Sequence, residues 1–271
     1  MKLINIYVGA LLKITKNINI GLHILKKDFN LINLSIVIPC FNESKSLPRL
    51  FLACLNACKG RNDIQFVFVN NGSNDDTQIV LDQLLNLEVF KFGKSVHVPI
   101  NKGYGFGILQ GLMVAEGRIL SWTHADLQTD PKDVILAYEL YKVELESNQC
   151  IVKGERKGRN FFDNLFTGGM SVMASFFLNQ KLWDINAQPK IFHRDFMNHL
   201  KKAPYDFSLD LYLLFVANKI KISINSFPVF FSNREFGVAK GGGTLKGKFK
   251  LIKRTIGYII ELRNDIIKGN R

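Results

Sequence analysis

The sequence predicts an α/β protein with a mostly parallel sheet covered by helices on both faces. Short β-branched and aromatic runs alternate with segments of helical spacing, which is typical of such sheets. The chain has 271 residues and is 47% hydrophobic. A chain of this length buries roughly 75% of its unfolded surface, so it can form one large core.

Each predicted element follows from a local pattern. Apolar or β-branched runs predict strands at 34–39, 66–69, 96–98 and 118–122. Helical spacing predicts helices at 44–58, 75–85 and 104–116 and a further helix that begins after Pro131. No repeat or Pro/Ser-rich linker interrupts the chain. We therefore expect one domain over residues 34–240, a basic segment at 1–33 and a basic amphipathic helix at 241–271.

Composition excludes several classes of protein. The apolar content excludes a disordered chain. Four scattered cysteines do not make a disulfide scaffold and suit a reducing compartment, and Cys54 and Cys58 are expected to pack in the core rather than bind zinc. The longest uncharged stretch, residues 164–180, is shorter than the roughly 20 residues of a membrane-spanning helix. No signal-peptide cleavage site is evident at the N-terminus.

The positive charge is concentrated at the two ends of the chain. Of the net charge of +13, residues 1–33 carry +4 and residues 238–271 carry +7. Basic ends are typical of surfaces that contact anions. In the C-terminal segment, isoleucines recur at helical spacing with Lys and Arg between them. This pattern predicts a helix that either lies in a membrane interface or packs on its own domain.

Ligands of parallel sheets bind at the carboxyl ends of the strands, which brings the loops at 39–43, 70–76, 101–107 and 124–128 together. Gly103 and Gly105 precede a helix, where glycines allow either close approach of a phosphate or a tight turn. His124, Asp126 and Gln128 alternate along the fourth loop. In extended chain all three would face one side, where they could hold a divalent cation that bridges phosphates. A single histidine such as His124 is, by itself, more often structural.

Four motifs of the chain carry a family resemblance. They are SIVIPCFNE at 35–43, VNNGSNDDT at 69–77, NKGYG at 101–105 and ADLQ at 125–128. In order and spacing they resemble the family 2 glycosyltransferases with the GT-A fold, a Rossmann-like architecture. The most similar branch is the dolichol-phosphate mannose synthase type, which transfers a sugar from a nucleotide diphosphate sugar to a polyprenyl phosphate. The resemblance extends over residues 34–240.

The resemblance implies a role for each matching position. The nucleotide pocket would contain Pro39, Phe41, Glu43, Asn70, Asn71, Gly103 and Gly105. The cation, Mg²⁺ or Mn²⁺, would be held by Asp126 with Gln128 and His124. The acceptor phosphate would be bound by Arg156 of a Gly-x-Arg element and by Arg234 and Lys240 of a late Arg…Gly…Lys element. The segment 184–192 stands where the branch has its acceptor-side loop.

Two positions depart from the family pattern. His124 replaces the first carboxylate of the usual Asp-x-Asp, and an imidazole ligand favours Mn²⁺ over Mg²⁺. Asn70 and Asn71 replace an acidic pair; an amide can pair with uracil but can also flip, which leaves the nucleobase open. These departures keep a non-catalytic relative among the alternatives.

The acceptor decides which further residues are catalytic. A phosphate acceptor is already ionised and needs cations, whereas a hydroxyl acceptor needs a carboxylate base, for which Asp210 and Asp184 are candidates. Relatives that transfer to hydroxyls usually carry a Glu-Asp pair that this chain lacks, so a lipid phosphate is favoured. The apolar segment 161–178 is either an interfacial helix or a core helix.

The sequence therefore favours an inverting glycosyltransferase with Asp126, Arg156, Asp210 and Arg234 in its catalytic site. We expect it to act as a peripheral protein on the cytoplasmic face of the cell membrane. The alternatives are transfer to a saccharide hydroxyl in cell-surface polysaccharide synthesis and a non-catalytic relative. A nucleic-acid partner would leave the four motifs unexplained and is not expected. The oligomeric state stays open.

Overall fold

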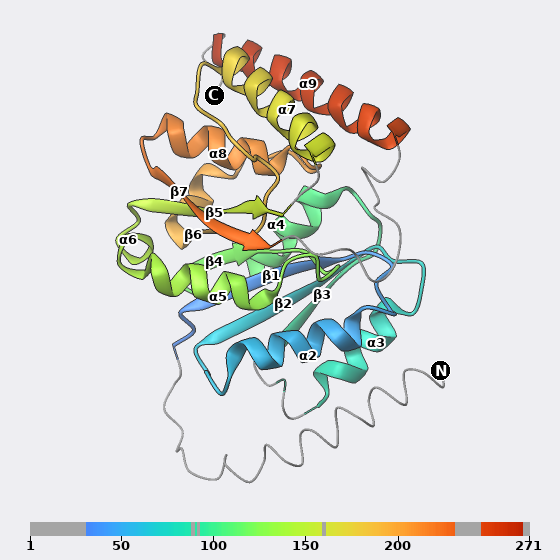
Figure 1. Ribbon diagram of the computed structural model, residues 1–271. Helices are drawn as coiled ribbons and strands as arrows, with labels where there is room; N and C mark the ends of the chain where they lie inside the picture. The colour runs from blue at the N-terminus through green and yellow to red at the C-terminus, as the bar shows by residue number, and fades with distance from the viewer. Residues whose placement is uncertain (1–30, 88–89, 91–92, 159–160, 231–244, 268–271) are drawn as a thin grey trace.

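The computed structural model describes residues 31–267 apart from 88–89, 91–92, 159–160 and 231–244 (Figure 1). Within helices, the side chains of 161–167, 245–252 and 266–267 are not described. The predicted segment 1–33 lies almost wholly outside the described residues, as does the predicted boundary at 240–241. These domain boundaries therefore stay predictions.

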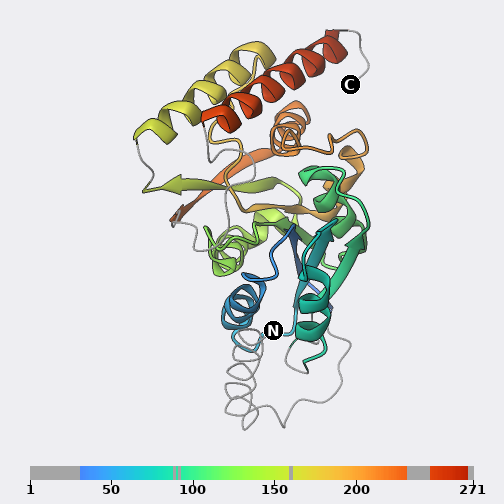
Figure 2. The same cartoon turned by 90° about the vertical axis from the view of Figure 1, so that its right-hand side faces the viewer.

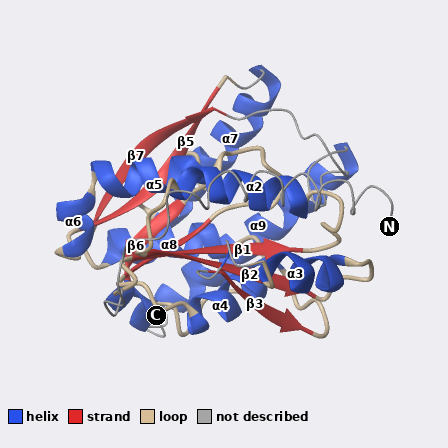
Figure 3. Ribbon diagram, turned by 90° about the horizontal axis from the view of Figure 1, so that it is seen from below, coloured by secondary structure: helices blue, strands red, loops and turns tan. Residues whose placement is uncertain are grey.

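A seven-stranded sheet forms the centre of the described part, in the order β3-β2-β1-β4-β6-β5-β7. Its strands are β1 (Leu34–Cys40), β2 (Ile64–Asn71), β3 (Gly93–Val98), β4 (Ile119–Trp122), β5 (Cys150–Lys157), β6 (Lys190–His193) and β7 (Ser223–Phe230). Strands β1 to β4 are parallel, as Figure 3 shows for β1, β2 and β3, and β5 pairs with β7 in parallel. Only β6 pairs antiparallel, with β4 and β5. The predicted mostly parallel sheet is confirmed.

Helices cover both faces of this sheet (Figures 1 and 2). The described helices are α2 (Leu47–Cys58), α3 (Thr77–Leu85), α4 (Tyr104–Val114), α5 (Pro131–Leu140), α6 (Lys142–Glu146), α7 (Phe161–Leu178), the 3₁₀ helix η3 (Arg194–His199), α8 (Leu209–Lys219) and α9 (Leu245–Ile267). Successive strand residues face opposite sides. On β1, Ile36 and Ile38 pack with α2, α3 and α5, whereas Val37 packs with α4. Burial on both faces explains the continuous apolar run that predicted this strand.

The cysteines lie inside this core. All four are free and buried, which confirms the expectation that Cys54 and Cys58 pack in the core. They share the α2 side of the sheet with a cluster of aromatic rings, in which Phe51 stacks on Phe68 with their ring centroids 4.2 Å apart.

Helices α7 and α9 lie side by side at one end of the molecule (Figures 1 and 2). The predicted C-terminal helix is thus present, and one face of it packs on its own domain through Tyr258, Ile259 and Leu262. Ile260, one of the isoleucines that recur at helical spacing in this segment, is not on the packed face and is 47% exposed. No helix in the described residues is long and apolar enough to span a membrane.

Candidate active site

The first two of the four predicted loops are joined by hydrogen bonds beyond the ends of β1 and β2. The backbone N–H of Asn42 donates to Ser73 Oγ and that of Glu43 donates to Thr77 Oγ1, both at 2.9 Å. The backbone N–H of Asn74 donates to Asn42 Oδ1 at 2.8 Å. These bonds fix the carboxyl end of β1 to the segment that leads into α3.

The third and fourth loops adjoin this pair. Asn71 Nδ2 donates to the Gly103 carbonyl at 3.0 Å, which joins the second loop to the start of α4. The rings of Tyr104 and His124 lie with their centroids 6.0 Å apart, which brings the fourth loop alongside. The predicted convergence of the four loops is confirmed.

The residues expected to line a nucleotide pocket lie along this edge. Pro39 and Phe41 are half-buried, and the carboxylate of Glu43 accepts a hydrogen bond from Ser46 Oγ at 2.5 Å. Asn70 Nδ2 donates to Gln78 Oε1 at 2.9 Å and its Oδ1 accepts from the Ser73 backbone N–H at 3.1 Å.

Asn71 differs from Asn70 in one respect. Its Nδ2 is bonded to Gly103, but its Oδ1 is buried without a hydrogen-bond partner among the described residues. A buried unpaired carbonyl oxygen costs about 1–3 kcal/mol, so Asn71 keeps an acceptor that a ligand could satisfy. Contact of either asparagine with a nucleobase stays a prediction.

Gly103 and Gly105 have no side chains, which allows the backbone of residues 204–206 to pack closely against them. A Cβ at Gly103 would lie 2.3 Å from the Tyr205 carbonyl oxygen, and one at Gly105 would lie 2.5 Å from that of Pro204. Gly103 also has φ +121°, which favours glycine. The close approach that these glycines permit here is that of residues 204–206, and contact with a phosphate stays a prediction.

The fourth loop is bent, so the expectation of an extended chain there is wrong. Leu127 has φ +56°, and the Gln128 N–H donates back to Asp126 Oδ1 at 3.1 Å. His124 is half-buried; burial lowers its pKa, against the charges of Asp126 and Asp210, and leaves a neutral imidazole at pH 7. The described residues include no cluster of three His, Cys, Asp or Glu side chains that could hold a metal ion.

The donor chemistry of this loop nevertheless fits a cation that is bound jointly with a ligand. The loop offers three possible ligand groups: the carboxylate of Asp126, the amide of Gln128 and the neutral imidazole of His124. A Mg²⁺ ion beside phosphates usually takes only one or two protein carboxylates and completes its shell with phosphate oxygens and water. Assignment of these three residues as ligands stays a prediction.

Arg156, at the end of β5, is held by Asp184. The Arg156 N–H and Nε donate to opposite oxygens of this carboxylate at 2.8 and 2.9 Å, and Nη2 adds a further ion-pair contact. Burial alone would raise the pKa of Asp184, but the bonds and charge of Arg156 outweigh it and hold the pKa below its ordinary value. Gly154 allows this strand to approach: its N–H donates to the Pro189 carbonyl at 2.8 Å, and a Cβ there would lie 2.0 Å from the Gln188 carbonyl oxygen.

Asp210, in the first turn of α8, is buried at 1% exposure. Its Oδ1 accepts from Gln188 Nε2 at 2.8 Å and from Trp122 Nε1 at 3.3 Å, and it lies 3.2 Å from Lys190 Nζ. The same Gln188 amide donates to the Tyr104 hydroxyl at 3.1 Å. The carboxylate of Asp210 is therefore buried and contacts Gln188, Trp122 and Lys190 rather than solvent.

Sequence reasoning did not single out the partners of Asp210. Gln188 and Lys190 lie in the segment 184–192, which the motif match noted only as a whole. The one local signal that could have found Lys190 is its position as a lysine between apolar residues, after Pro189 and before Ile191. Burial lowers its pKa, although Asp210 opposes the shift. Arg234 and Lys240, the other expected cations, lie outside the described residues.

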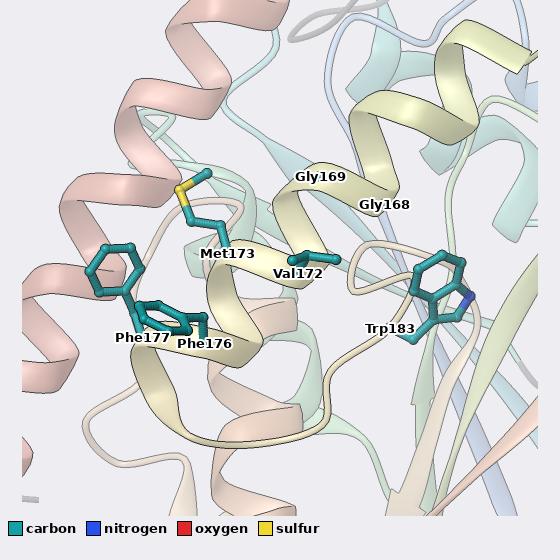
Figure 4. A pocket seen from close by; sticks show the side chains of 7 residues that line it. All are labelled: Gly168, Gly169, Val172, Met173, Phe176, Phe177 and Trp183. Atoms are coloured by element: carbon teal, nitrogen blue, oxygen red, sulfur yellow. The ribbon is translucent and has the colours of Figure 1, made fainter.

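An apolar pocket of about 700 Å³ lies on α7 beside Trp183 (Figure 4). Its lining is Gly168, Gly169, Val172, Met173, Phe176, Phe177 and Trp183. Phe176 is 79% exposed, Val172 65% and Trp183 55%. Trp183 directly precedes Asp184, the partner of Arg156, so this apolar surface adjoins the charged part of the site.

Comparison with known proteins identifies the family. The profile described as glycosyl transferase family 2 matches residues 35–208, which contain all four loops. The chain belongs to this family. It is therefore a glycosyltransferase, as the motifs indicated.

The similar proteins include transferases that act on lipid phosphates. A dolichyl-phosphate beta-glucosyltransferase of Trichomonas vaginalis is 27% identical over 82% of this chain and 73% of its own length. An undecaprenyl-phosphate 4-deoxy-4-formamido-L-arabinose transferase of Proteus mirabilis is 31% identical over 37% of this chain, but the alignment spans only 31% of that protein. The corresponding transferase of Klebsiella pneumoniae is 25% identical over 76% of this chain and 62% of its own length.

The fold also matches solved glycosyltransferase structures of the GT-A type. Glucosyl-3-phosphoglycerate synthase of Mycobacterium tuberculosis superimposes with a TM-score of 0.67 at 14% identity, covering 86% of this chain and 80% of that one. That enzyme was crystallised with Mn²⁺, UDP-glucose and phosphoglyceric acid. At this identity the likeness establishes the fold alone.

Proposed function

We propose that this chain is an inverting transferase that moves a sugar from a nucleotide diphosphate sugar to a polyprenyl phosphate at a membrane surface. The observation that carries the proposal is that the Arg156–Asp184 pair adjoins two surfaces. Besides burial, the charge of Arg156 is close enough to His124 of the fourth loop to lower its pKa, and Trp183 of the exposed apolar pocket directly precedes Asp184. The names of the aligned relatives from Trichomonas, Proteus and Klebsiella, each a transferase on dolichyl or undecaprenyl phosphate, support it.

The donor would bind along the four loops. Asn70 and Asn71 would face the base, while Pro39, Phe41 and Glu43 would line the pocket. Asp126, with Gln128 and His124, would hold Mg²⁺ or Mn²⁺ on the diphosphate. A divalent cation bound there neutralises the charge that grows on the leaving diphosphate.

The acceptor phosphate would be bound by Arg156. A phosphate monoester is ionised at pH 7, so it needs cations for positioning and no general base. Arg234 and Lys240 are the further cations that we assign to this phosphate. A general base must lie within hydrogen-bond reach of the acceptor hydroxyl that it deprotonates. Asp210 is buried, so it is poorly placed for this role, which favours a phosphate acceptor.

The membrane contact would be made by α7 and α9. Phe176, Val172 and Trp183 expose apolar surface, while the adjacent α9 carries the exposed Arg263, whose guanidinium lies over the Phe177 ring. Each Lys or Arg near an anionic leaflet contributes about 1 kcal/mol to binding. We assign this surface to an anionic phospholipid bilayer, at the cytoplasmic face that the reduced cysteines suit.

A transfer assay tests the proposal. Purified chain with Mn²⁺ and a panel of labelled UDP-, GDP- and CDP-sugars is offered polyprenyl phosphate, unphosphorylated polyprenol or an oligosaccharide. We expect label on polyprenyl phosphate only, and a higher acceptor KM in Arg156→Gln but not in the remote Arg118→Gln. Transfer to the oligosaccharide with polyprenyl phosphate inert would instead indicate a hydroxyl acceptor. No transfer from any donor would contradict a catalytic role.

A further inference from the structure

We propose that Arg254 of α9 is a positioning residue for this reaction, an inference that rests on the proposed function. It holds the loop at residues 203–208 in place and, through Phe207, fixes the aromatic ring of Tyr104 beside His124. The C-terminal helix would then support the reaction centre in addition to any contact with a membrane.

Arg254 contacts two neighbouring residues of this loop. Its Nε lies 3.1 Å from Asp206 Oδ2, and its guanidinium carbon lies 5.0 Å from the centre of the Phe207 ring. The other oxygen of the carboxylate, Asp206 Oδ1, accepts the Ser208 N–H at 2.8 Å. One planar guanidinium thus makes an ion pair and a cation–π contact at once, a combination for which arginine is better shaped than lysine.

Phe207 connects Arg254 to the interior of the site through its contact with Tyr104. Its ring stacks on Tyr104 with centroids 4.6 Å apart and planes inclined by 7°. The Tyr104 hydroxyl accepts from Gln188 Nε2, and the same amide donates to Asp210. A continuous set of contacts therefore runs from α9 to the buried anion of the site.

The loop has a second anchor on α4. The Phe106 N–H, in the first turn of that helix, donates to the Tyr205 carbonyl at 2.9 Å. Gly103 allows this approach, since a Cβ there would meet the same carbonyl oxygen. The loop is thus held against α4 on one side and by Arg254 on the other, and loss of Arg254 leaves the α4 anchor alone.

The test compares Arg254→Gln with Lys253→Gln. Both changes remove one positive charge from an exposed residue of α9, so both alter the net charge of the chain by the same amount. Transfer is measured with a detergent-solubilised polyprenyl phosphate, which removes the need for a membrane. We expect Arg254→Gln to lower kcat about tenfold with little change in the donor KM, because a small displacement of catalytic groups costs rate.

Two further variants separate positioning from charge. Arg254→Lys keeps the charge and is expected to restore part of the lost kcat. Phe207→Leu removes the ring stack, and its effect should not add to that of Arg254→Gln, because both break the same set of contacts. Lys253→Gln should stay within about twofold of wild type.

Hydrogen–deuterium exchange gives a readout without turnover. We expect faster exchange at residues 203–209 in Arg254→Gln than in Lys253→Gln. Equal exchange in both variants, or faster exchange with an unchanged kcat, would overturn the inference. An inactive wild type with every acceptor would instead count against the proposed function, while the exchange comparison would still decide whether Arg254 anchors the loop.

Discussion

Lys153 and Lys190 lie opposite each other on β5 and β6, and both are buried. Lys190 is paired with Asp210, whereas Lys153 Nζ donates to the Gly154 carbonyl at 3.2 Å. Burial, and then the charge of Lys190, lower the pKa of Lys153 to about 8. The folded protein therefore tolerates a partly compensated positive charge beside the Arg156–Asp184 pair.

This pKa predicts how stability depends on pH. Between about pH 8 and the ordinary lysine value of about 10.4, the folded state has released a proton that the unfolded state keeps, so stability rises with pH. In Lys153→Met this contribution is absent. In urea unfolding across that pH range, the free energy of unfolding of wild type should rise by up to about 3 kcal/mol relative to that of Lys153→Met. A difference that stays flat or falls with pH would contradict the burial of this charge.

The close packing of the Gln188 backbone against Gly154 leads to a second prediction for a single residue. An added Cβ would meet the Gln188 backbone at 2.0 Å, so Gly154→Ala should lose about 2–3 kcal/mol of unfolding free energy. Gly257, in α9, has open space where a Cβ would lie, and Gly257→Ala should gain about 0.5–1 kcal/mol through helix propensity. Chemical denaturation of both variants provides the measurement. A loss below about 0.5 kcal/mol in Gly154→Ala would refute the close approach.

Motifs identified several residues of the site, but not the pairing between them. Asp126, Arg156 and Asp210 each stand in a recognisable local context. Their partners come from other elements: Asp184 lies 28 residues from Arg156, and Gln188 lies 22 residues from Asp210. No local pattern encodes such contacts, which depend on how the segment that precedes β6 lies against β5 and α8.

At the scale of elements, predictability differs along the chain. The strands and helices up to α5 follow their predicted ranges closely, because buried parallel strands and amphipathic helices leave strong local patterns. Strands β5, β6 and β7 were not predicted. Buried Lys153 and Lys190 interrupt the apolar pattern, and β7 is largely exposed or half-buried. The packing of α9 on α7 likewise depends on tertiary contacts.

Helix α7 carries the prediction for membrane contact. Phe176 is 79% exposed beside the apolar pocket, so Phe176→Ser should lower the affinity for anionic vesicles about tenfold, the equivalent of one aromatic side chain leaving the interface (Figure 4). Val143→Ser, at an equally exposed position on α6, is the matched control and should change little. Flotation of the variants with vesicles measures this. Equal binding of both would exclude α7 from the contact.

At the scale of the whole molecule, the net charge of +13 predicts salt-dependent binding. The screening length falls from about 10 Å at 0.1 M salt to about 3 Å at 1 M. Binding to anionic vesicles should therefore weaken strongly over this range, and binding to zwitterionic vesicles should be weak throughout. Vesicle binding that is insensitive to salt would show that charge does not drive the attachment.

The central claim is that the four loops, brought together by the fold, form a nucleotide-sugar site. Calorimetric titration with UDP, GDP and CDP, each with and without Mn²⁺, tests it most directly. The account predicts that one nucleotide binds in a metal-dependent way and that Asp126→Ala abolishes this binding, while Asp195→Asn on the surface leaves it intact. Absence of nucleotide binding under every metal condition, or binding that Asp126→Ala leaves unchanged, would contradict it.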